Sequence, residues 1–489
     1  MNKFLNALTD ISSFKTTENG AIAKSTTNLK VYDMFALGGA YRTRSEVDCI
    51  LLFKHAFEED PLLAIKCLFY LGDVREGQGE RRFFRICLKW LAINHPEVVS
   101  HNLKNIPIYR RWDDLYELID TPIEKEVWAF VREQINVDLE CRTPSLCAKW
   151  LKSENTSSKK SCELGCRTRK ALGLSHKQYR KLLSHLREKI NIVERLMSSN
   201  QWDKIEFDKL PSKAGLIYRN AFARHEYARY SAFAISEETK VNASTLYPYE
   251  VVGKALDYYR HNYYSNTIDK PERAMINKYW DNLTDYFNEA SLNALAVVDT
   301  SGSMCGLPMQ VAISLGLYCA DKAKGPFYDH YISFSSRPQL VKCEGVDFVD
   351  KVGRIYANSI VEDTNLEATF DLILSIAFAN NLSQDDLPAS LIIISDMEVN
   401  QCTQFYTDDD LELFMETMRT KWKKMGYEVP KLIFWNVDAR KNTILDSSPT
   451  TTYISGFSPT IFQQVLSGKT GYELCLEKLN SERYSLISL

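Results

Sequence analysis

Five oxygen-bearing side chains in the second half of the sequence have the types and spacing of a metal site. They are Asp299, Ser301, Ser303, Thr364 and Asp396. Thr369 is an alternative source of the threonine hydroxyl. Carboxylate and hydroxyl oxygens are ligands that a hard divalent cation prefers, with waters completing the octahedron. The set therefore predicts bound Mg²⁺, or another divalent cation such as Mn²⁺ or Ca²⁺. Because hydroxyls do not neutralise the ion, it could still bind an anionic ligand.

The two aspartates each follow a short apolar run that predicts a buried strand. Residues 292–298 precede Asp299, and residues 390–395 precede Asp396. In open parallel sheets, ligands bind beyond the carboxyl ends of the strands. Thr364 stands just before a predicted helix at 366–380. We therefore expect all five side chains to meet at one edge of a sheet.

Strands and helices alternate throughout this part of the chain. The further predicted strands are 329–335, 431–437 and 451–454, and the further predicted helices are 308–322 and 410–425. Alternation of this kind predicts a doubly wound α/β domain, which we place at residues 291–489.

The region before it has a helical pattern, with apolar residues at spacings of three, four and seven. Residues 31–290 therefore form a predicted helical domain, including helices at 80–93, 122–139 and 212–229. On pattern alone, an α-solenoid of degenerate helix pairs and an irregular helical bundle are equally compatible. Residues 1–30, rich in Thr, Ser and Asn, predict a flexible arm.

Charge is distributed unevenly along a chain whose formal net charge is only −3. Residues 141–230 carry 20 lysines and arginines against 8 acidic residues, whereas residues 290–489 carry 16 against 25. The basic middle is either a surface for a polyanion or a set of solvated helix faces. If this basic region binds RNA, Tyr179 and Trp150 could stack on bases, and lysine and arginine side chains could contact phosphates. The candidates are Lys149, Lys152, Arg167, Arg169, Lys170, Lys177, Tyr179, Arg180, Lys181 and Arg187.

Other features of the sequence narrow the class of protein. The cysteines are scattered singly through apolar helical patterns, which is typical of a reducing compartment. With no long apolar run and no signal-peptide pattern at the start, we expect a cytoplasmic monomer that does not contact a membrane. A zinc site at Cys141, Cys147, Cys162 and Cys166, with His176 and His185 beyond, is disfavoured by poor spacing. We expect no enzyme activity, because no pattern of nucleophile and base is visible.

Helical repeats followed by this metal motif resemble the Ro autoantigen family, whose helical module is called TROVE. The chain is more similar still to a little-characterised Ro-like family of about this length, found in eukaryotes, bacteria and large viruses. The matching stretches are 73–82, 146–150, 179–187, 197–202, 247–250 and 299–309. The five metal candidates match the metal-ion-dependent adhesion site of von Willebrand factor A domains. The resemblance implies HEAT-like helix pairs that could form a ring closed by the A domain.

Two functions follow from these features. The first is a non-enzymatic RNA-binding protein of Ro type, which binds small structured or single-stranded RNA on its basic helices. The second is a protein-interaction scaffold whose metal ion holds an acidic side chain of a partner protein.

Overall fold

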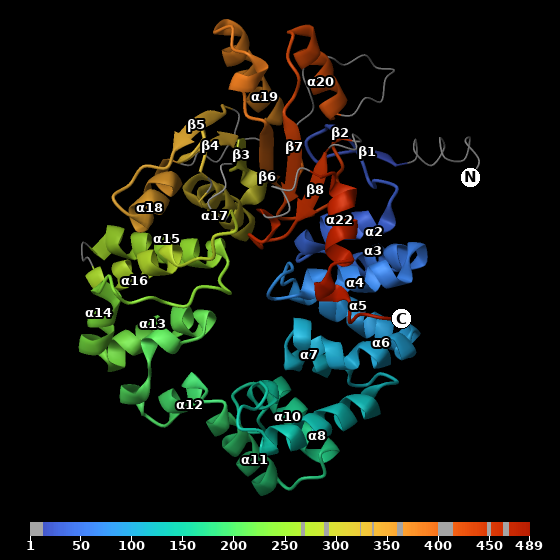
Figure 1. Cartoon of the computed structure of the whole chain (residues 1–489), viewed down its shortest axis with the longest axis vertical. Coiled ribbons are helices and arrows are strands. Elements are labelled where there is room, and N and C mark those ends of the chain that lie inside the picture. Colours follow the sequence, from blue (N-terminus) through green and yellow to red (C-terminus); the bar gives the residue numbers. More distant parts are fainter. Residues whose placement is uncertain are drawn as a thin grey trace. The chain divides into compact units, whose positions relative to one another are not determined.

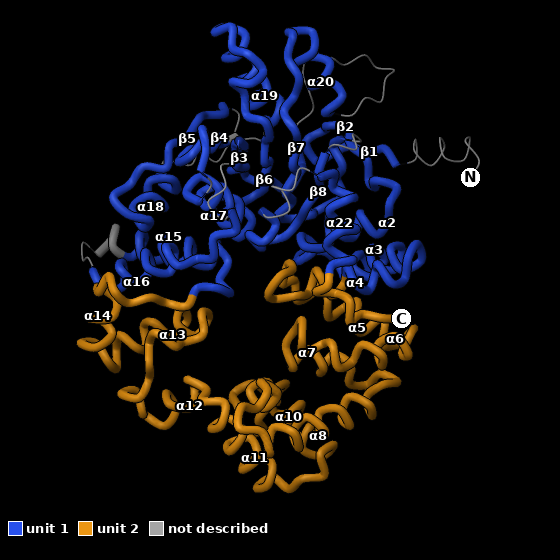
Figure 2. Tube along the Cα trace, viewed as in Figure 1, with its two compact units in different colours: residues 1–67, 243–481 blue, residues 68–242, 482–489 orange. Residues whose placement is uncertain are grey.

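The computed structural model describes residues 13–265, 269–287, 293–322, 324–334, 337–358, 365–399, 414–446, 451–462 and 469–489. The chain packs into two compact units, shown in Figure 2. Unit 1 consists of residues 1–67 and 243–481, and unit 2 consists of residues 68–242 and 482–489. The units thus group segments by contact, whereas the predicted boundary at residue 290 follows the change of sequence pattern.

Unit 1 is built around a six-stranded sheet with the order β5-β4-β3-β6-β7-β8. The strands are β3 (Ala294–Asp299), β4 (His330–Phe334), β5 (Gln339–Lys342), β6 (Ser390–Ser395), β7 (Lys431–Asn436) and β8 (Thr452–Ser455). All neighbouring pairs are parallel except β4 and β5. The central strands read as continuous apolar runs because helices cover both faces of such a sheet. This is the predicted doubly wound α/β fold, similar to an A domain.

Helices from both ends of the chain complete unit 1. They are α2 (Lys30–Leu37), α3 (Glu46–Glu59), α15 (Pro248–Ser265), α16 (Lys270–Asp281), α17 (Leu307–Lys322), α18 (Phe348–Asn358), α19 (Leu366–Ala379), α20 (Phe414–Lys424) and α22 (Gly471–Leu479). In Figure 1 the strands β3, β6, β7 and β8 lie between α17 and α22. Several helices begin at side-chain caps, for example α19 at Asn365 and α22 at Thr470.

Strand β5 is an element that the sequence did not predict. It pairs antiparallel with β4 at the edge of the sheet, with Ser333 opposite Gln339. Its residues are mostly exposed, so it lacks the apolar run that marks the central strands. The predicted helix at 410–425 is α20 from Phe414, and residues 410–413 lie outside the described part.

The expectation of a flexible arm is wrong for residues 13–30. Strands β1 (Phe14–Thr16) and β2 (Ile22–Lys24) form an antiparallel pair. Ala21, Ile22 and Ala23 are buried, and Lys24 exchanges backbone hydrogen bonds of 2.8 and 2.9 Å with Ile444. Because its partner is more than 400 residues away, this packing has no local sequence signal.

Unit 2 is helical. Its helices are α5 (Arg81–Asn94), α6 (Pro96–Asn102), α7 (Ile106–Tyr109), α8 (Glu124–Glu140), α9 (Cys147–Trp150), α10 (Lys159–Ala171), α11 (His176–Lys189), α12 (Val193–Ser198), α13 (Ser212–His225) and α14 (Tyr227–Ile235). Helix α4 (Pro61–Gly72) begins in unit 1 and ends in unit 2. The predicted helix at 212–229 is two helices, because Glu226 leaves the helical conformation. Neighbours α5 and α6, and α13 and α14, pack as pairs, in agreement with helical repeats.

The segment 73–82 holds the last residues of the chain within unit 2. Asp73, which is fully buried, accepts hydrogen bonds of 2.9 and 3.0 Å from Arg483 and one of 3.2 Å from Tyr484. Tyr109 donates to the carbonyl of Arg483. This stretch, which the sequence comparison with the Ro-like family marked out, therefore acts as a structural clasp: it holds residues 482–489 in place within unit 2.

No helix in the described residues is long and apolar enough to span a membrane.

Candidate metal centre and basic helices

The two predicted metal-binding aspartates lie where the strand order of the sheet reverses. The chain runs from β3 to β4 on one side and continues with β6 on the other side of β3. Such a switch point opens a crevice beyond the strand ends, where doubly wound folds bind ligands. Asp299 ends β3 and Asp396 directly follows β6, and Val298 lies opposite Ile394. The fold therefore brings the two carboxylates to neighbouring positions at one edge.

Asp299 is fully buried, and its carboxylate accepts two hydrogen bonds. Its Oδ1 accepts a 2.9 Å hydrogen bond from the backbone N–H of Ser301, and its Oδ2 accepts one of 2.6 Å from the hydroxyl of Ser395. The hydroxyls of Ser301 and Ser303 lie 3.0 Å apart. Burial, together with the charge of Asp396, raises the pKa of Asp299 to about 7. The motif thus concentrates negative charge where water does not screen it.

Asp396 has one oxygen that is left without a donor. Its Oδ1 accepts a 3.1 Å hydrogen bond from the backbone N–H of Glu398. Its Oδ2 is buried and accepts no hydrogen bond in the part of the chain described. Burial raises the pKa of this carboxyl as well. A buried carboxylate oxygen without a donor costs free energy, and a cation would satisfy it.

The turn after Asp396 carries backbone strain. Met397 has φ 66°, in the left-handed region that non-glycine residues rarely adopt. Its N–H donates to the hydroxyl of Ser395 over 3.0 Å, which fixes the turn. Strain of this kind costs about 1–3 kcal/mol and clusters at functional sites.

The side chains gathered at this edge of the sheet have the donor atoms that a divalent cation requires. Asp299, Ser301, Ser303 and Asp396 supply only oxygen donors, and Oδ2 of Asp396 accepts no hydrogen bond from the described residues. The donor set therefore fits a hard cation. Thr364 lies outside the described residues. Thr369 is buried in α19, and its hydroxyl has no hydrogen-bond partner in the described part of the chain.

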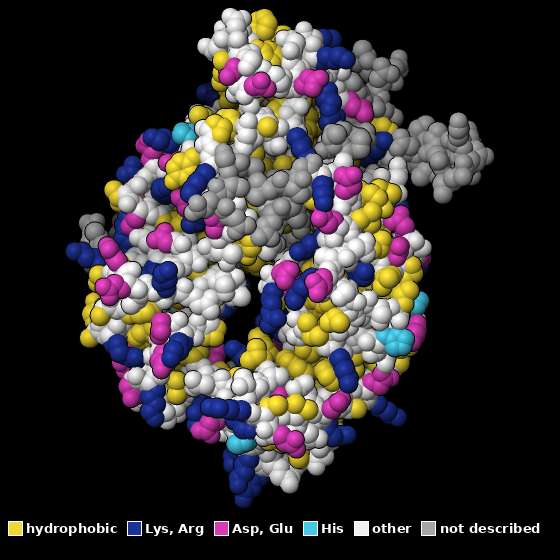
Figure 3. Space-filling view, in the orientation of Figure 1, with side chains coloured by type: hydrophobic (Ala, Val, Ile, Leu, Met, Phe, Trp, Pro, Cys, Tyr) yellow, Lys and Arg dark blue, Asp and Glu magenta, His cyan; other side chains and the backbone are white. Residues whose placement is uncertain are grey.

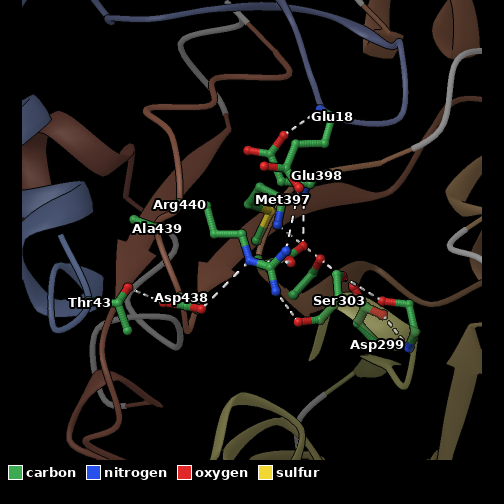
Figure 4. Close-up of polar contacts among 12 residues, drawn as sticks. Glu18, Thr43, Asp299, Ser303, Met397, Glu398, Asp438, Ala439 and Arg440 are labelled. Atoms are coloured by element: carbon green, nitrogen blue, oxygen red, sulfur yellow. Dashed lines mark hydrogen bonds and ion pairs between the residues drawn. The ribbon is translucent and has the colours of Figure 1, made fainter. Parts of the chain in front are cut away.

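Arg440 is a residue of this site that the sequence did not reveal. It follows β7, the strand next to β6. Its Nε lies 3.7 Å from Oδ2 of Asp396, and its Nη2 donates to the backbone carbonyl of Ser303. Figure 4 shows the guanidinium directed at the metal motif. The available signal was its position just after a third buried apolar strand.

Half of the proposed RNA-contacting side chains are engaged within unit 2. Arg187 donates to the carbonyls of Ala148 and Leu151 at 2.9 and 2.7 Å. Arg169 donates to Glu154, Arg167 pairs with Asp120, and Lys152 lies 3.6 Å from Asp113. The expectation that Tyr179 stacks on bases is wrong, because its ring is buried and its hydroxyl donates to Lys152.

Four of the five remaining candidates lie on the surface of two consecutive helices. Lys170 at the end of α10, and Lys177, Arg180 and Lys181 on α11, are all exposed. None of the four forms an ion pair within the described residues. Lys149 is half-buried, with its Nζ 5.8 Å from the ring centre of Trp150. Among the described residues, the cysteines and histidines of the disfavoured zinc site form no group that could hold a metal ion. Cys147 is buried in α9, and Cys162 contacts Thr156.

The fold and the site define a class of protein: a helical unit joined to an A-domain-like α/β unit with a candidate metal motif at its strand ends. The chain belongs to the DUF2828 family, a domain of unknown function, whose model matches residues 17–137 and 141–292 and so more than half of the chain. A second family model, DUF7788, also a domain of unknown function, matches residues 293–483.

Similar proteins give no direct statement of function. Among curated proteins, the chain is 29% identical to the uncharacterized protein L728 of Acanthamoeba polyphaga mimivirus, over 93% of this chain and 84% of that protein. Among solved structures, it is similar to the RO (RSR) protein of Deinococcus radiodurans, with 11% identity and a TM-score of 0.33. That comparison covers 93% of this chain and 99% of the other. With a score this low, function has to be argued from the residues themselves.

Proposed function

We propose that this protein is a non-enzymatic RNA-binding protein of Ro type, which binds small structured or single-stranded RNA on the basic face of α10 and α11. The observation that carries the proposal is the set of exposed cations on these two helices. Lys177, Arg180 and Lys181 are spaced by three and four residues, so they share one face of α11. The opposite face carries the buried Tyr179, Leu183 and Leu186.

This arrangement separates packing from binding. Because the apolar face holds α11 in place, the exposed cations can contact phosphates. Figure 3 shows lysine and arginine side chains over α11, at the lower edge of the view. Phosphate contacts release counterions, so affinity should fall steeply with salt. Lys170, at the end of α10, is exposed as well.

A triple variant tests the RNA proposal. Lys177→Gln, Arg180→Gln and Lys181→Gln together should weaken binding to labelled RNA at least about tenfold and reduce the salt slope by about 2–3. The matched control removes three exposed lysines elsewhere in unit 2, as Lys89→Gln, Lys125→Gln and Lys240→Gln. Fluorescence anisotropy with structured and single-stranded RNA would measure both. Absence of wild-type binding at low salt, or an equal loss in the control, would refute the proposal.

The α/β unit supports a second, separable role. Oδ2 of Asp396, which accepts no hydrogen bond among the described residues, favours a divalent cation held by Asp299, Ser301, Ser303 and Asp396. When bound, the cation would supply positive charge that grips an anionic ligand, and an acidic side chain of a protein partner is the alternative to a phosphate. Asp299→Ala should abolish Mg²⁺-dependent capture of such a partner while RNA binding survives. An unchanged set of captured proteins would count against this role.

The remaining expectations concern the state of the protein in the cell. We expect a cytoplasmic monomer in which Mg²⁺ is the resident ion and Mn²⁺ or Ca²⁺ can replace it. Light scattering after gel filtration tests whether the protein is a monomer. Metal analysis of protein purified without chelator tests which ion is resident.

A further inference from the structure

Arg440 joins the metal motif to the N-terminal segment of unit 1. On one side its guanidinium contacts Oδ2 of Asp396 and the carbonyl of Ser303. On the other side its Nη1 lies 3.4 Å from Oε2 of Glu18. Asp438 lies 3.8 Å from its Nε. The side chain is about one third exposed, at 34%, so it can move without disturbing the core.

The backbone that carries Arg440 is anchored without its side chain. The N–H of Ala439 donates to the carbonyl of Ala40 over 3.1 Å. Arg44 donates to the carbonyl of Arg440 over 2.8 Å, and the hydroxyl of Thr43 donates to Asp438 over 2.9 Å. Substitution of the guanidinium should therefore leave the loop in place.

Glu18 is held just as firmly. Its backbone N–H donates to Oε2 of Glu398 over 2.7 Å. The side chain of Asn19 donates to the carbonyl of Glu398 over 2.6 Å, and the hydroxyl of Thr17 donates to the carbonyl of Val399 over 2.7 Å. These bonds fix the N-terminal segment to the turn that follows Asp396 (Figure 4). They place a second carboxylate within reach of the same guanidinium.

We propose that Arg440 is a built-in counter-cation of the metal motif, and that Glu18 is the carboxylate that holds its guanidinium when a divalent cation binds. The inference rests on the proposed metal site. Oδ2 of Asp396 accepts no hydrogen bond among the described residues, so its attraction to Arg440 is one of charge alone. With a divalent cation held at Asp396, the guanidinium of Arg440 would give up its 3.7 Å contact with Asp396 and keep its existing 3.4 Å pair with Glu18. Metal affinity is thus set by a charge exchange between three side chains.

The proposal predicts opposite effects for the two ends of the contact. Arg440→Gln should tighten the binding of Mg²⁺ and Mn²⁺ at least tenfold, because the competing charge is gone. Arg440→Lys, which keeps the charge, should stay within threefold of the wild type. Glu18→Gln should weaken binding at least threefold. In the double variant the Glu18 substitution should have no further effect, since the guanidinium on which it acts is absent.

The experiment measures metal binding by the full-length protein. Free Mn²⁺ is followed by electron paramagnetic resonance and Mg²⁺ by calorimetry, with circular dichroism as the check of folding. Arg354→Gln and Glu344→Gln are controls of equal charge change on exposed ion pairs of unit 1, Arg354 with Asp350 and Glu344 with Lys342. Both should bind metal like the wild type.

The outcomes separate this inference from the metal site itself. If wild type and Arg440→Gln both fail to bind metal, the site and the inference fall together. If the wild type binds metal and Arg440→Gln matches its control, only the inference is overturned. A Glu18 effect that persists in the double variant would overturn the coupling through Arg440.

Discussion

The pair of buried aspartates should give the metal-free protein a stability that depends on pH in an unusual direction. Burial and the charge of Asp396 raise the pKa of Asp299 from 3.8 to about 7. A carboxyl whose pKa is raised by folding stabilises the protein below its unfolded pKa, and this contribution is lost as pH rises through the folded pKa. The shift of about three units corresponds to roughly 4 kcal/mol lost between pH 4 and pH 8.

Asp299→Asn removes the titrating group while keeping its shape. We expect the free energy of unfolding of wild type in EDTA to fall, relative to the variant, as pH rises from 4 to 8. Mg²⁺ should offset about two thirds of this loss in the wild type at pH 7, because a ligand at a hundred times its Kd stabilises by about 2.7 kcal/mol, whereas the variant lacks the ligand oxygen and should gain less. Urea denaturation at several pH values, with and without Mg²⁺, measures both effects.

A control and a refuting result complete this test. Asp385→Asn, at an exposed aspartate of the same unit, should follow the wild type at every pH. If wild type and Asp299→Asn show parallel pH profiles in EDTA, folding does not raise the pKa of Asp299. Equal stabilisation of both by Mg²⁺ would place the metal elsewhere.

Three substitutions test the packing of unit 2, one at helix α11 and two in the segment 73–82. Arg187→Met should lower the free energy of unfolding by about 2–4 kcal/mol, because buried carbonyl acceptors lose a charged donor; urea denaturation checks this, and an unchanged midpoint would show that Arg187 is free to bind a ligand. Asp73→Asn should cost about 3–5 kcal/mol by leaving the Arg483 guanidinium without its buried partner, and should expose residues 482–489 to carboxypeptidase; resistance like that of wild type would contradict the clasp. Gly77→Ala should destabilise by about 1–3 kcal/mol, because an added Cβ would overlap the carbonyl oxygen of Tyr70; a stable variant in thermal denaturation would mean that the loop relaxes.

Much of the α/β unit was predictable because its signals are local. The apolar runs at 292–298, 390–395 and 431–437 correspond to β3, β6 and β7 within one or two residues. A parallel strand covered on both faces must be apolar throughout, so its sequence marks it without reference to neighbours. Because the carboxyl ends of parallel strands lie at one edge of a sheet, the sequence also predicts that Asp299 and Asp396 share that edge.

The edges of the sheet were less predictable. Strand β5 is mostly exposed and pairs on one side only, so nothing in its own residues distinguishes it from a loop. Strands β1 and β2 depend on partners near residue 444. Their burial is a property of the packed unit rather than of the segment.

In the basic helices, too, composition predicted one property and packing decided another. Composition marked residues 141–230 as basic, but it could not tell which cations face solvent. Arg187 and Lys181 belong to the same helix, yet Arg187 donates to three partners of unit 2 while Lys181 is exposed. The difference comes from the side of α11 that packs on residues 148–153, and only the structure supplies it.

By itself, the sequence determined the kinds of elements, the position of the metal motif at two strand ends and the basic character of the middle helices. Each of these follows from the local periodicity, spacing or composition of the sequence. The tertiary structure decided that Glu18 and Arg440 stand beside Asp396, that residues 13–30 are packed, and that only part of the basic set is exposed. Contacts across hundreds of residues depend on how the elements pack, and periodicity in one segment does not show which distant segment it packs against.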